Sequence, residues 1–536
     1  MDPRRERLRY MILLFVPLIL SAYTHLWNPL GFPSIHIDEA HYMRRAMLII
    51  EGMGPQESAA SGYPRTYDHP YFGQIFLAGA LSIIGYPDII KPSSDLQSIE
   101  SLHLMPRLLM GILAIIDTLL VFKIAERRYG VTVAFIASVF FAVMPMTWIL
   151  RRVYLDTILI PFMLSSILFA VYLKRDDKFT ITKDQNKYEI SQGALILLSG
   201  IFLGLAIFTK APAFAIMPLV GSLVFFNSQK RLKSLAIWII PVILIPILWP
   251  LYSVVVGQTD LWLEWVLWQT DRSSPASVWL TDFFEIDPLI TIIGVLGFIW
   301  TGLKRDFLPL AWAGPFLIFS YFIGWVQYFH LIVIFPAFCI ASAVFIDGLQ
   351  KFVAQKFKKS RRIMPLSQVT FLMITLFGII ISSILINSDV NSSYYKVYAA
   401  IAESIPTPKN GQNANITLIG SHWWVWDSYW ITQYVLNKDH KLIDPHFDPK
   451  FKLPVTTKNI VFIDDEKFLD AISKNVKSDN LLLIRQLHGE SYIINSFFDN
   501  VTRYDNGVYP NNIFSIMVAN ENRPLGEITI KGITRS

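Results

Sequence analysis

The chain opens with 1-MDPRRERLRYMILLFVPLILSAYTHLW-27, in which a basic segment is followed by a long apolar run. An apolar run of about 20 residues is long enough to cross a bilayer as a helix. Because no small-residue cleavage site follows it, we expect a retained first span rather than a cleaved signal peptide. The basic flank predicts that the N-terminus faces the cytoplasm.

Similar apolar runs recur through much of the chain. Of its 536 residues, 53% are hydrophobic and only 16% are charged, whereas a soluble domain is usually about 25% charged. This composition predicts a polytopic, all-α membrane protein, and a net charge of +6 needs no nucleic-acid partner. One cysteine excludes an internal disulfide framework. We expect about eleven spans, near 10–27, 103–122, 131–146, 156–173, 192–208, 212–226, 235–256, 287–302, 308–323, 331–349 and 366–386.

The distribution of Lys and Arg among the loops agrees with eleven spans. With the N-terminus inside, every predicted inner loop is basic, as the positive-inside rule requires. An odd number of spans then places the C-terminus on the outer, extracytoplasmic side. The membrane would be the plasma membrane or that of the endoplasmic reticulum. The inner segments are 4–9, 123–128, 174–187, 229–233, 303–305 and 351–362.

Two outer regions are long enough to fold. Within 1–386, the predicted membrane domain, the first outer loop (28–102) exceeds a simple connector and contains two amphipathic stretches, 38–52 and 69–86. We expect both stretches to be helices lying at the membrane interface.

The tail, 387–536, combines strand-like runs such as 416–420 and 459–464 with a helix-like stretch, 465–476. This alternation predicts a small extracytoplasmic α/β domain. Three glycosylation sequons fit an external location, although chance matches are frequent in an Asn-rich tail. They begin at Asn391, Asn415 and Asn500.

Charged residues at the outer ends of the spans are the first functional candidates, because ionisable groups are costly there. Carboxylates could activate a hydroxyl group, and arginine or lysine could hold a phosphate. The alternative is that these residues are ion pairs and interfacial anchors that reach water. For Asp156 a helix N-cap is a further alternative. The acidic candidates are Asp38, Glu39, Asp68 and Asp156; the basic ones are Arg44, Arg45, Arg107, Arg151, Arg152, Lys210 and Arg272; the histidines are His69 and His330.

A divalent metal is the weaker hypothesis, and no cofactor is predicted. His36 and His41 flank Asp38 and Glu39, but the four residues lack a strict ligand spacing.

Five segments, taken in order, resemble the protein O-mannosyltransferase family (glycosyltransferase family 39) and the related lipid A aminoarabinose transferases. The first pairs Asp38-Glu39 with DHPYFGQ (68–74). The others are HLMPRLLMGILA (103–114), RRVYLDTILIPF (151–162), LGLAIFTKAPAF (203–214) and YFHLIVIFPAF (328–338). The resemblance covers roughly residues 10–350 and implies the GT-C helical fold, with a polyprenyl-phosphate sugar as donor.

The resemblance also implies roles for individual residues. Asp38 would be the catalytic base with Glu39 beside it, Asp156 the second acidic residue, and Arg107 a supporting or phosphate-binding residue. His69 would match the family's His-Pro. The family often has lysine where this chain has Gln74, so that phosphate contact is not implied here. The resemblance does not imply a protein acceptor either. The 257–286 loop is too short to hold the β-trefoil domain that the eukaryotic protein O-mannosyltransferases carry there.

The predicted reaction is an inverting transfer at the outer face. Asp38 accepts the proton of an acceptor hydroxyl group, from a glycan, protein or lipid, while cations such as Arg107, Lys210 and Arg272 stabilise the phosphate that leaves. One alternative is an oligosaccharyltransferase-like enzyme, since 421-SHWWVWDSYW-430 faintly resembles the Trp-Trp-Asp motif of that class. Another is a lipid or solute transporter, which would need charged groups at mid-membrane depth. Asp117 is the clearest charge inside a predicted span, but it has no matching partner in the sequence.

Overall fold

A computed structural model gives the structure of the chain, and it divides into two compact units that are described separately. The helical unit comprises Met1–Trp27, Tyr67–Gly73 and Leu109–Ser383, and the loop-and-sheet unit comprises Asn28–Thr66, Gln74–Leu108 and Ile384–Ser536. The residues described are 3–33, 35–55, 67–90, 95–173, 179–183, 186–271, 276–323, 326–356, 366–389, 391 and 395, with strands 416–420, 440–443, 455–463, 476–486, 500–505 and 527–534.

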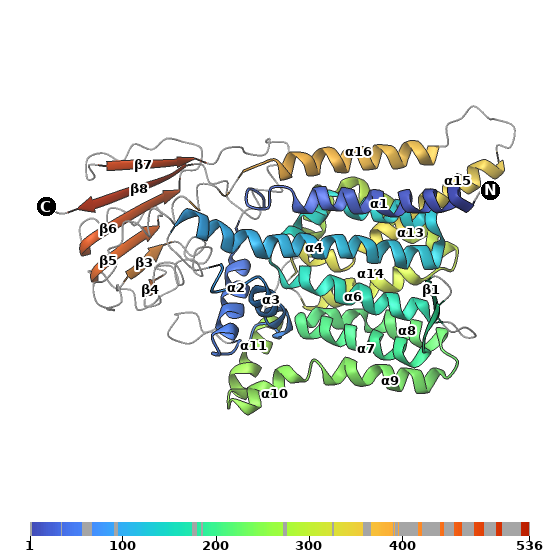
Figure 1. Cartoon of the computed structure of the whole chain (residues 1–536), viewed down its shortest axis with the longest axis horizontal. Helices are drawn as coiled ribbons and strands as arrows, with labels where there is room; N and C mark the ends of the chain where they lie inside the picture. Colours follow the sequence, from blue (N-terminus) through green and yellow to red (C-terminus); the bar gives the residue numbers. More distant parts are fainter. Residues whose placement is uncertain are drawn as a thin grey trace. The chain divides into compact units, whose positions relative to one another are not determined.

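Long helices make up most of the helical unit, and in Figure 1 they run in nearly one direction. The short hairpin strands β1 (Phe179–Lys183) and β2 (Asn186–Ile190) pair antiparallel. The helices, some shared with the other unit, are α1 (Pro3–Leu26), α4 (Leu96–Tyr129), α5 (Val131–Val143), η2 (Pro145–Arg151), α6 (Leu155–Tyr172), α7 (Gln192–Thr209), η3 (Ala211–Ile216), α8 (Met217–Asn227), α9 (Arg231–Leu244), α10 (Leu248–Val255), α11 (Thr259–Asp271), α12 (Ala276–Ile286), α13 (Pro288–Leu303), α14 (Leu308–Ile323), η4 (Tyr328–Val333), α15 (Phe335–Lys356) and α16 (Leu366–Ile386).

Many of these helices are suited to a membrane. Among the described residues, seven helical segments are long and apolar enough to cross a bilayer, and two bent helix pairs bring the number to nine. The pairs are Val131–Val143 with Pro145–Arg151, bent by 66°, and Leu280–Ile286 with Pro288–Leu303, bent by 114°. These helices make the chain an integral membrane protein.

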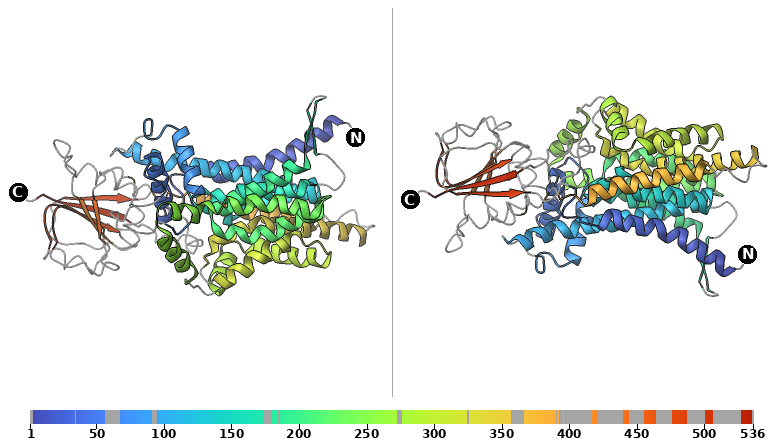
Figure 2. Two further views of the ribbon diagram at one scale, coloured as in Figure 1. Left: turned by 90° about the horizontal axis from the view of Figure 1, so that it is seen from below. Right: turned by 90° about the horizontal axis from the view of Figure 1, so that it is seen from above.

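The helices pack in a continuous series. α6 packs on α7 and α7 on α9, while α13 packs on α15, α15 on α5 and α5 on α1. Figure 2 shows the long helices of this unit side by side from two further directions. Glycines allow the close approach: a methyl group built at Gly200 would lie 2.5 Å from the carbonyl oxygen of Trp238 on α9. Small residues at helix crossings are typical of membrane proteins, because backbones there can come into direct contact.

In the loop-and-sheet unit, the two stretches predicted to be helical are helices. They are α2 (Ile37–Ile50) and α3 (Phe72–Ile83), whose first two residues belong to the helical unit. The predicted helix ends at 52 and 86 were too late. Glycine explains both ends, since Gly52 and Gly85 adopt positive φ angles of 76° and 89°, which favour glycine.

The tail contributes a six-stranded sheet in the order β4-β3-β5-β6-β8-β7. The four strands β4, β3, β5 and β6 are parallel, and β8 pairs antiparallel with both β6 and β7. Residues 416–420 and 459–463 of the predicted strands lie in β3 and β5. The predicted helix 465–476 lies almost wholly outside the described residues. The strands are β3 (Ile416–Gly420), β4 (His440–Ile443), β5 (Val455–Ile463), β6 (Val476–Gln486), β7 (Asn500–Asp505) and β8 (Glu527–Thr534).

Candidate active site

Asp38 lies in the first turn of α2, where the helix begins just after an extended residue. His36 is the N-cap, and its Nδ1 accepts a hydrogen bond of 3.3 Å from the backbone N–H of Asp38. The same Nδ1 is 3.9 Å from the Asp38 carboxylate, which is beyond hydrogen-bond range. The Asp38 side chain is 37% exposed, so its carboxylate is accessible to a substrate.

Glu39, the next residue, has the opposite environment. It is 3% exposed and forms a two-pronged ion pair with Arg107, at 3.0 Å from Nε to Oε1 and 2.7 Å from Nη2 to Oε2. Oε2 also accepts the backbone N–H of His36 at 3.1 Å. Glu39 therefore fixes the first turn of α2 to α4, and its oxygens are committed to protein donors.

Arg107 is equally committed. Its remaining terminal nitrogen, Nη1, donates to the carbonyl oxygens of Pro29 and Pro33, at 2.9 and 2.7 Å, and the side chain is 1% exposed. Every guanidinium nitrogen thus donates to a protein oxygen. Of the two predicted roles for Arg107, this geometry favours support of the site over contact with phosphate.

Asn391, just beyond α16, also binds the backbone of the loop before α2, which Arg107 contacts at Pro29 and Pro33. Its Nδ2 donates to the carbonyl oxygens of Leu30 and Pro33, at 2.8 and 2.7 Å, and its Oδ1 accepts the N–H of Ile35 at 3.0 Å. The carbonyl of Pro33 is therefore shared by Arg107 and Asn391. Because Asn391 is fully buried, its side chain is unavailable for N-glycosylation in this fold, and this sequon does not report on location.

Two further contacts close the network around this loop. Asn28 donates to the carbonyl oxygens of Ile386 and Ser388, at 3.0 and 2.9 Å. Tyr395 packs edge-on against His103, with ring centroids 4.9 Å apart. Burial raises the pKa of Tyr395 well above its usual value, so this side chain stays neutral.

In the helical unit, Asp156 and Lys210 form the corresponding buried pair. Asp156 lies in the first turn of α6 and Lys210 is the C-cap of α7. Lys210 Nζ donates to Asp156 Oδ2 at 2.6 Å, and both side chains are less than 8% exposed. The N-cap of α6 is Tyr154, so the alternative of an N-cap role for Asp156 is wrong. An ammonium group has three donors, and two remain beyond this bond.

Arg151 and Arg152 end the short helix η2 and are both buried. Arg151 donates to the carbonyl oxygens of Thr24 and Trp27 near the end of α1. The Arg152 guanidinium lies 4.8 Å from the ring centroid of Trp148 and donates to the Tyr154 hydroxyl at 2.9 Å. Arg151 therefore has a packing role, and Arg152 is held in an aromatic setting.

The DHPYF segment is fixed by α11 and the turn before it. The Tyr67 hydroxyl donates to Gln258 at 2.9 Å, and the Gln269 side chain donates to the carbonyl oxygen of Asp68 at 3.2 Å. Asp68 and His69 are both partly exposed. Their neighbours form an aromatic cluster of Tyr67, Tyr71, Phe72, Phe208, Trp249, Tyr252, Trp262 and Trp265, with Ile245 and Leu261.

His330 lies in η4, where its Nδ1 accepts the N–H of Gln327 at 3.1 Å and its ring lies 4.4 Å from that of Phe329. Arg272 and the Trp-rich segment 421–430 lie outside the described residues. Across the part of the chain that is described, no three His, Cys, Asp or Glu side chains gather as a metal site.

The sequence-based interpretation of Arg44 and Arg45 as anchors to lipid headgroups is wrong, because both side chains are at most 1% exposed. Residues 39–48 of α2 are buried on every side of the helix, whereas the sequence predicts an amphipathic helix with one face in water. Asp117 is fully buried in α4, and neither carboxylate oxygen has a hydrogen-bond partner among the described residues.

Sequence reasoning missed Asn391 and Tyr395 as parts of the network around Asp38. In the sequence, Asn391 stands out only as the first residue of a sequon. No local pattern could have found either residue, because their contacts join segments about 360 residues apart.

Comparison with known proteins gives a family match over part of the chain. Residues 64–261 match the sequence model of the family described as dolichyl-phosphate-mannose-protein mannosyltransferase. The match includes Asp68, Arg107, Asp156 and Lys210 but begins after Asp38. A comparison with curated proteins finds no match.

Two solved structures share the fold. ArnT from Cupriavidus metallidurans, bound to undecaprenyl phosphate, gives a TM-score of 0.55 at 13% identity over 97% of this chain and 97% of that chain. The Archaeoglobus fulgidus oligosaccharyltransferase, tethered with an acceptor peptide containing the NVT sequon, gives 0.53 at 14% identity over 89% of this chain and 69% of that chain. The predicted resemblance to GT-C glycosyltransferases is thus confirmed, and the chain has their membrane-embedded helical fold.

Proposed function

We propose that this chain is an inverting glycosyltransferase that moves a sugar from a polyprenyl phosphate to a hydroxyl acceptor at the outer membrane face. The observation that carries the proposal is the contrast at the start of α2. Asp38 presents an accessible carboxylate, while the adjacent Glu39 is buried and bound by Arg107. A base must be reachable and firmly positioned, and this arrangement supplies both properties to Asp38.

In the proposed step, the acceptor hydroxyl lies against Asp38. Its proton passes to the Asp38 carboxylate as its oxygen forms a bond to the anomeric carbon, and the bond from that carbon to the phosphate oxygen breaks. Attack opposite the leaving phosphate inverts the configuration. Proton transfer to a positioned base contributes about 10²–10⁴-fold to the rate. Glu39 and Arg107 act as positioning residues that hold the first turn of α2.

The leaving phosphate carries negative charge and needs a cation rather than a general acid. Lys210 is the best candidate, because two of its N–H donors remain after the bond to Asp156. Arg152, Arg272, His69, His330 and Asp68 stay as candidate substrate-binding residues. Asp156 then orients the Lys210 ammonium group and is a positioning residue in this scheme.

The proposed topology has eleven spans with the N-terminus in the cytoplasm. Seven single helical segments and two bent pairs account for nine, and the shorter apolar helices Ala211–Asn227 and Leu308–Phe322 bring the total to eleven. The basic loops support this orientation. In the proposed eleven-span topology, Asp38 and Lys210 are on the same side of the membrane. The tail is then an extracytoplasmic α/β domain.

The donor class follows from the relatives. The matched family is named for dolichyl-phosphate mannose, and ArnT was solved with undecaprenyl phosphate. A glycan, protein or lipid could each supply the acceptor hydroxyl.

The second candidate is transfer to asparagine, as in an oligosaccharyltransferase. It is favoured by the fold shared with the Archaeoglobus fulgidus enzyme. A divalent-metal requirement would support it.

The experiment that tests the proposal is product analysis. The purified full chain in nanodiscs is incubated with mannose and aminoarabinose polyprenyl phosphates and with lipid, glycan, Ser/Thr-peptide and sequon-peptide acceptors, with and without a chelator. We expect mass spectrometry to detect a sugar joined to a hydroxyl group, and NMR of the product to show the inverted anomeric configuration. Transfer only to asparagine would support the second candidate. No transfer with any donor, together with solute uptake into vesicles, would support a transporter and contradict both enzyme proposals.

A further inference from the structure

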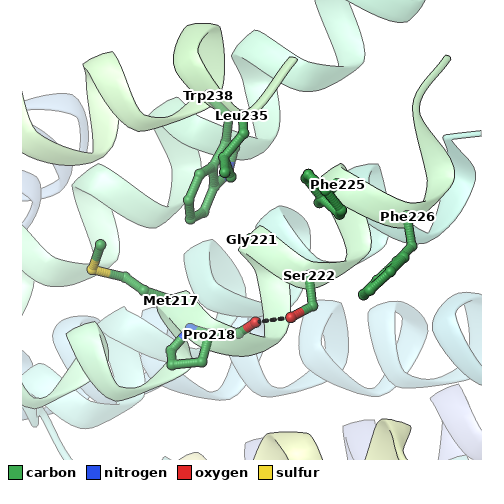
Figure 3. Close-up of a pocket in the computed structure, with 8 residues that line it drawn as sticks. All are labelled: Met217, Pro218, Gly221, Ser222, Phe225, Phe226, Leu235 and Trp238. Atoms are coloured by element: carbon green, nitrogen blue, oxygen red, sulfur yellow. Dashed lines mark hydrogen bonds between the residues drawn. The ribbon is translucent and has the colours of Figure 1, made fainter. Parts of the chain in front are cut away.

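An apolar groove lies between α8 and α9, in the helical unit, and neither Asp156 nor Lys210 lines it. Figure 3 shows the side chains that line it, and its volume is about 390 Å³. The lining is mainly apolar, with the only hydroxyl group, that of Ser222, donating to the Pro218 carbonyl oxygen at 2.6 Å. The lining residues are Met217, Pro218, Gly221, Ser222, Phe225, Phe226, Leu235 and Trp238.

Gly221 keeps the groove open. A methyl group built at its Cα would lie 3.3 and 3.4 Å from two carbon atoms of the Trp238 ring, so any larger side chain at this position would occupy the space beside the indole. The floor follows α8 over the ten residues from Met217 to Phe226, a rise of about 13 Å. The groove is therefore elongated along the helix axis, as an extended hydrocarbon chain requires.

One end of the groove is basic. Lys230, Arg231 and Lys233 lie at the start of α9, and the two lysines are exposed. The Arg231 guanidinium lies over two rings of the lining, 5.5 Å from the centroid of Phe225 and 5.9 Å from that of Phe226. None of the three cations has a carboxylate partner among the described residues. An anion at this end would meet three positive charges.

Farther along α9 the groove is bounded by Trp238, whose six-membered ring edge faces Gly221. The indole N–H of Trp238 is buried and has no acceptor in the described part of the chain. It lies seven residues, or about 10 Å, along α9 from Arg231.

The surroundings identify the occupant as a membrane component. The outer faces of α8 and α9 carry large, exposed apolar side chains, including Phe226 at 62% and Leu232 at 76% exposure, which the acyl chains of a bilayer would cover. Basic pockets between membrane helices near the cytoplasmic surface bind anionic lipid headgroups.

We propose that this groove is a binding site for one anionic phospholipid, with an acyl chain along α8 and the phosphate among Lys230, Arg231 and Lys233. The proposal rests on the membrane fold and not on the transfer reaction. Its specificity lies in charge, because a zwitterionic lipid of equal chain length would fill the groove but lack the net charge that the three cations favour. The lipid would fasten α9 to α8 at the end of the unit where α9 begins.

The test measures which lipid stays on the protein. The full chain is reconstituted in nanodiscs with a one-to-one mixture of phosphatidylglycerol and phosphatidylcholine, extracted into mild detergent, and examined by native mass spectrometry. We expect a retained phosphatidylglycerol on the wild-type chain. The triple variant K230Q/R231Q/K233Q removes the charge, and G221L fills the groove. Each lost charge should weaken retention about fivefold, and both variants should lose the anionic lipid.

Two matched controls separate this site from general effects. K304Q removes a lysine from another basic loop, between α13 and α14, and G314L makes the same size change on α14, where no atom lies within 4 Å of a built methyl group. Both should retain phosphatidylglycerol. Size-exclusion profiles verify that each variant is folded, and the exposed lysine positions make folding of the charge variant secure.

Several results would overturn the proposal. Equal retention of both lipids by the wild-type chain would remove the charge selectivity. Unchanged retention in both K230Q/R231Q/K233Q and G221L would place the lipid elsewhere. A second copy of the chain, seen as a dimer that G221L dissolves, would assign the groove to a protein interface. Because transfer activity is not measured, failure here leaves the proposed reaction untouched.

Discussion

We predict that the ion pair of Glu39 and Arg107 makes a large contribution to the free energy of unfolding, because it fixes the first turn of α2 to α4. The pair is buried and joined by two hydrogen bonds, and Glu39 also binds the N–H of His36. In E39Q the amide nitrogen replaces one oxygen, so that a donor faces Arg107 or His36, and the guanidinium loses its counter-charge. Removal of one partner of a buried pair costs about 3–5 kcal/mol, and we expect that loss in the free energy of unfolding.

A double-mutant cycle isolates the pair from its surroundings. R107Q should cost about as much as E39Q, and E39Q/R107Q should cost less than their sum, with a coupling of about 2–3 kcal/mol. The assay is denaturant unfolding in lipid–detergent micelles, followed by tryptophan fluorescence. The control is the surface pair Asp347 and Lys351, whose lysine is 70% exposed, and K351Q should cost less than about 0.5 kcal/mol. Additive losses at Glu39 and Arg107, or losses as small as the control's, would refute the reasoning.

The remaining structural predictions concern three other contacts. N391A removes three hydrogen bonds from the loop before α2 and should cost about 2–4 kcal/mol in unfolding free energy; wild-type stability would contradict its role. D156N should cost about 3–5 kcal/mol and D156L/K210M should recover most of that loss without recovering transfer activity; restored activity would make the pair merely structural. G297A places a methyl group against the backbone of α15 and should lower the free energy of unfolding by about 1–3 kcal/mol. G314A places its methyl group in open space and should leave that free energy unchanged.

The sequence predicted the membrane helices well, because each needs only a local run of apolar residues. The N-terminal run, for example, gave α1 to within about one residue at its C-terminal end. The break between α9 and α10 was not predicted, since residues 235–256 read as one apolar stretch. Proline at 241 and 246 did not by itself specify where the helix would stop.

In the candidate site, too, the sequence predicts what is local and misses what depends on tertiary contacts. Asp38 and Glu39 are adjacent in the sequence and equivalent in residue type, yet one is accessible and the other buried. That difference depends on Arg107, 68 residues away, and on a loop fixed by Asn391 from beyond the last helix. Sequence patterns supplied the residue types, and only the tertiary contacts separate a base from a positioning residue.

The central claim is that the Asp38 carboxylate accepts the acceptor's proton. It is tested by the transfer rate of D38N at saturating polyprenyl-phosphate sugar, in nanodiscs, beside D88N, which neutralises an exposed aspartate of the same outer loop. The account predicts a rate about 10²–10⁴-fold lower for D38N, with donor binding retained, and a wild-type rate for D88N. A folded D38N that binds donor and transfers sugar at the wild-type rate would contradict it.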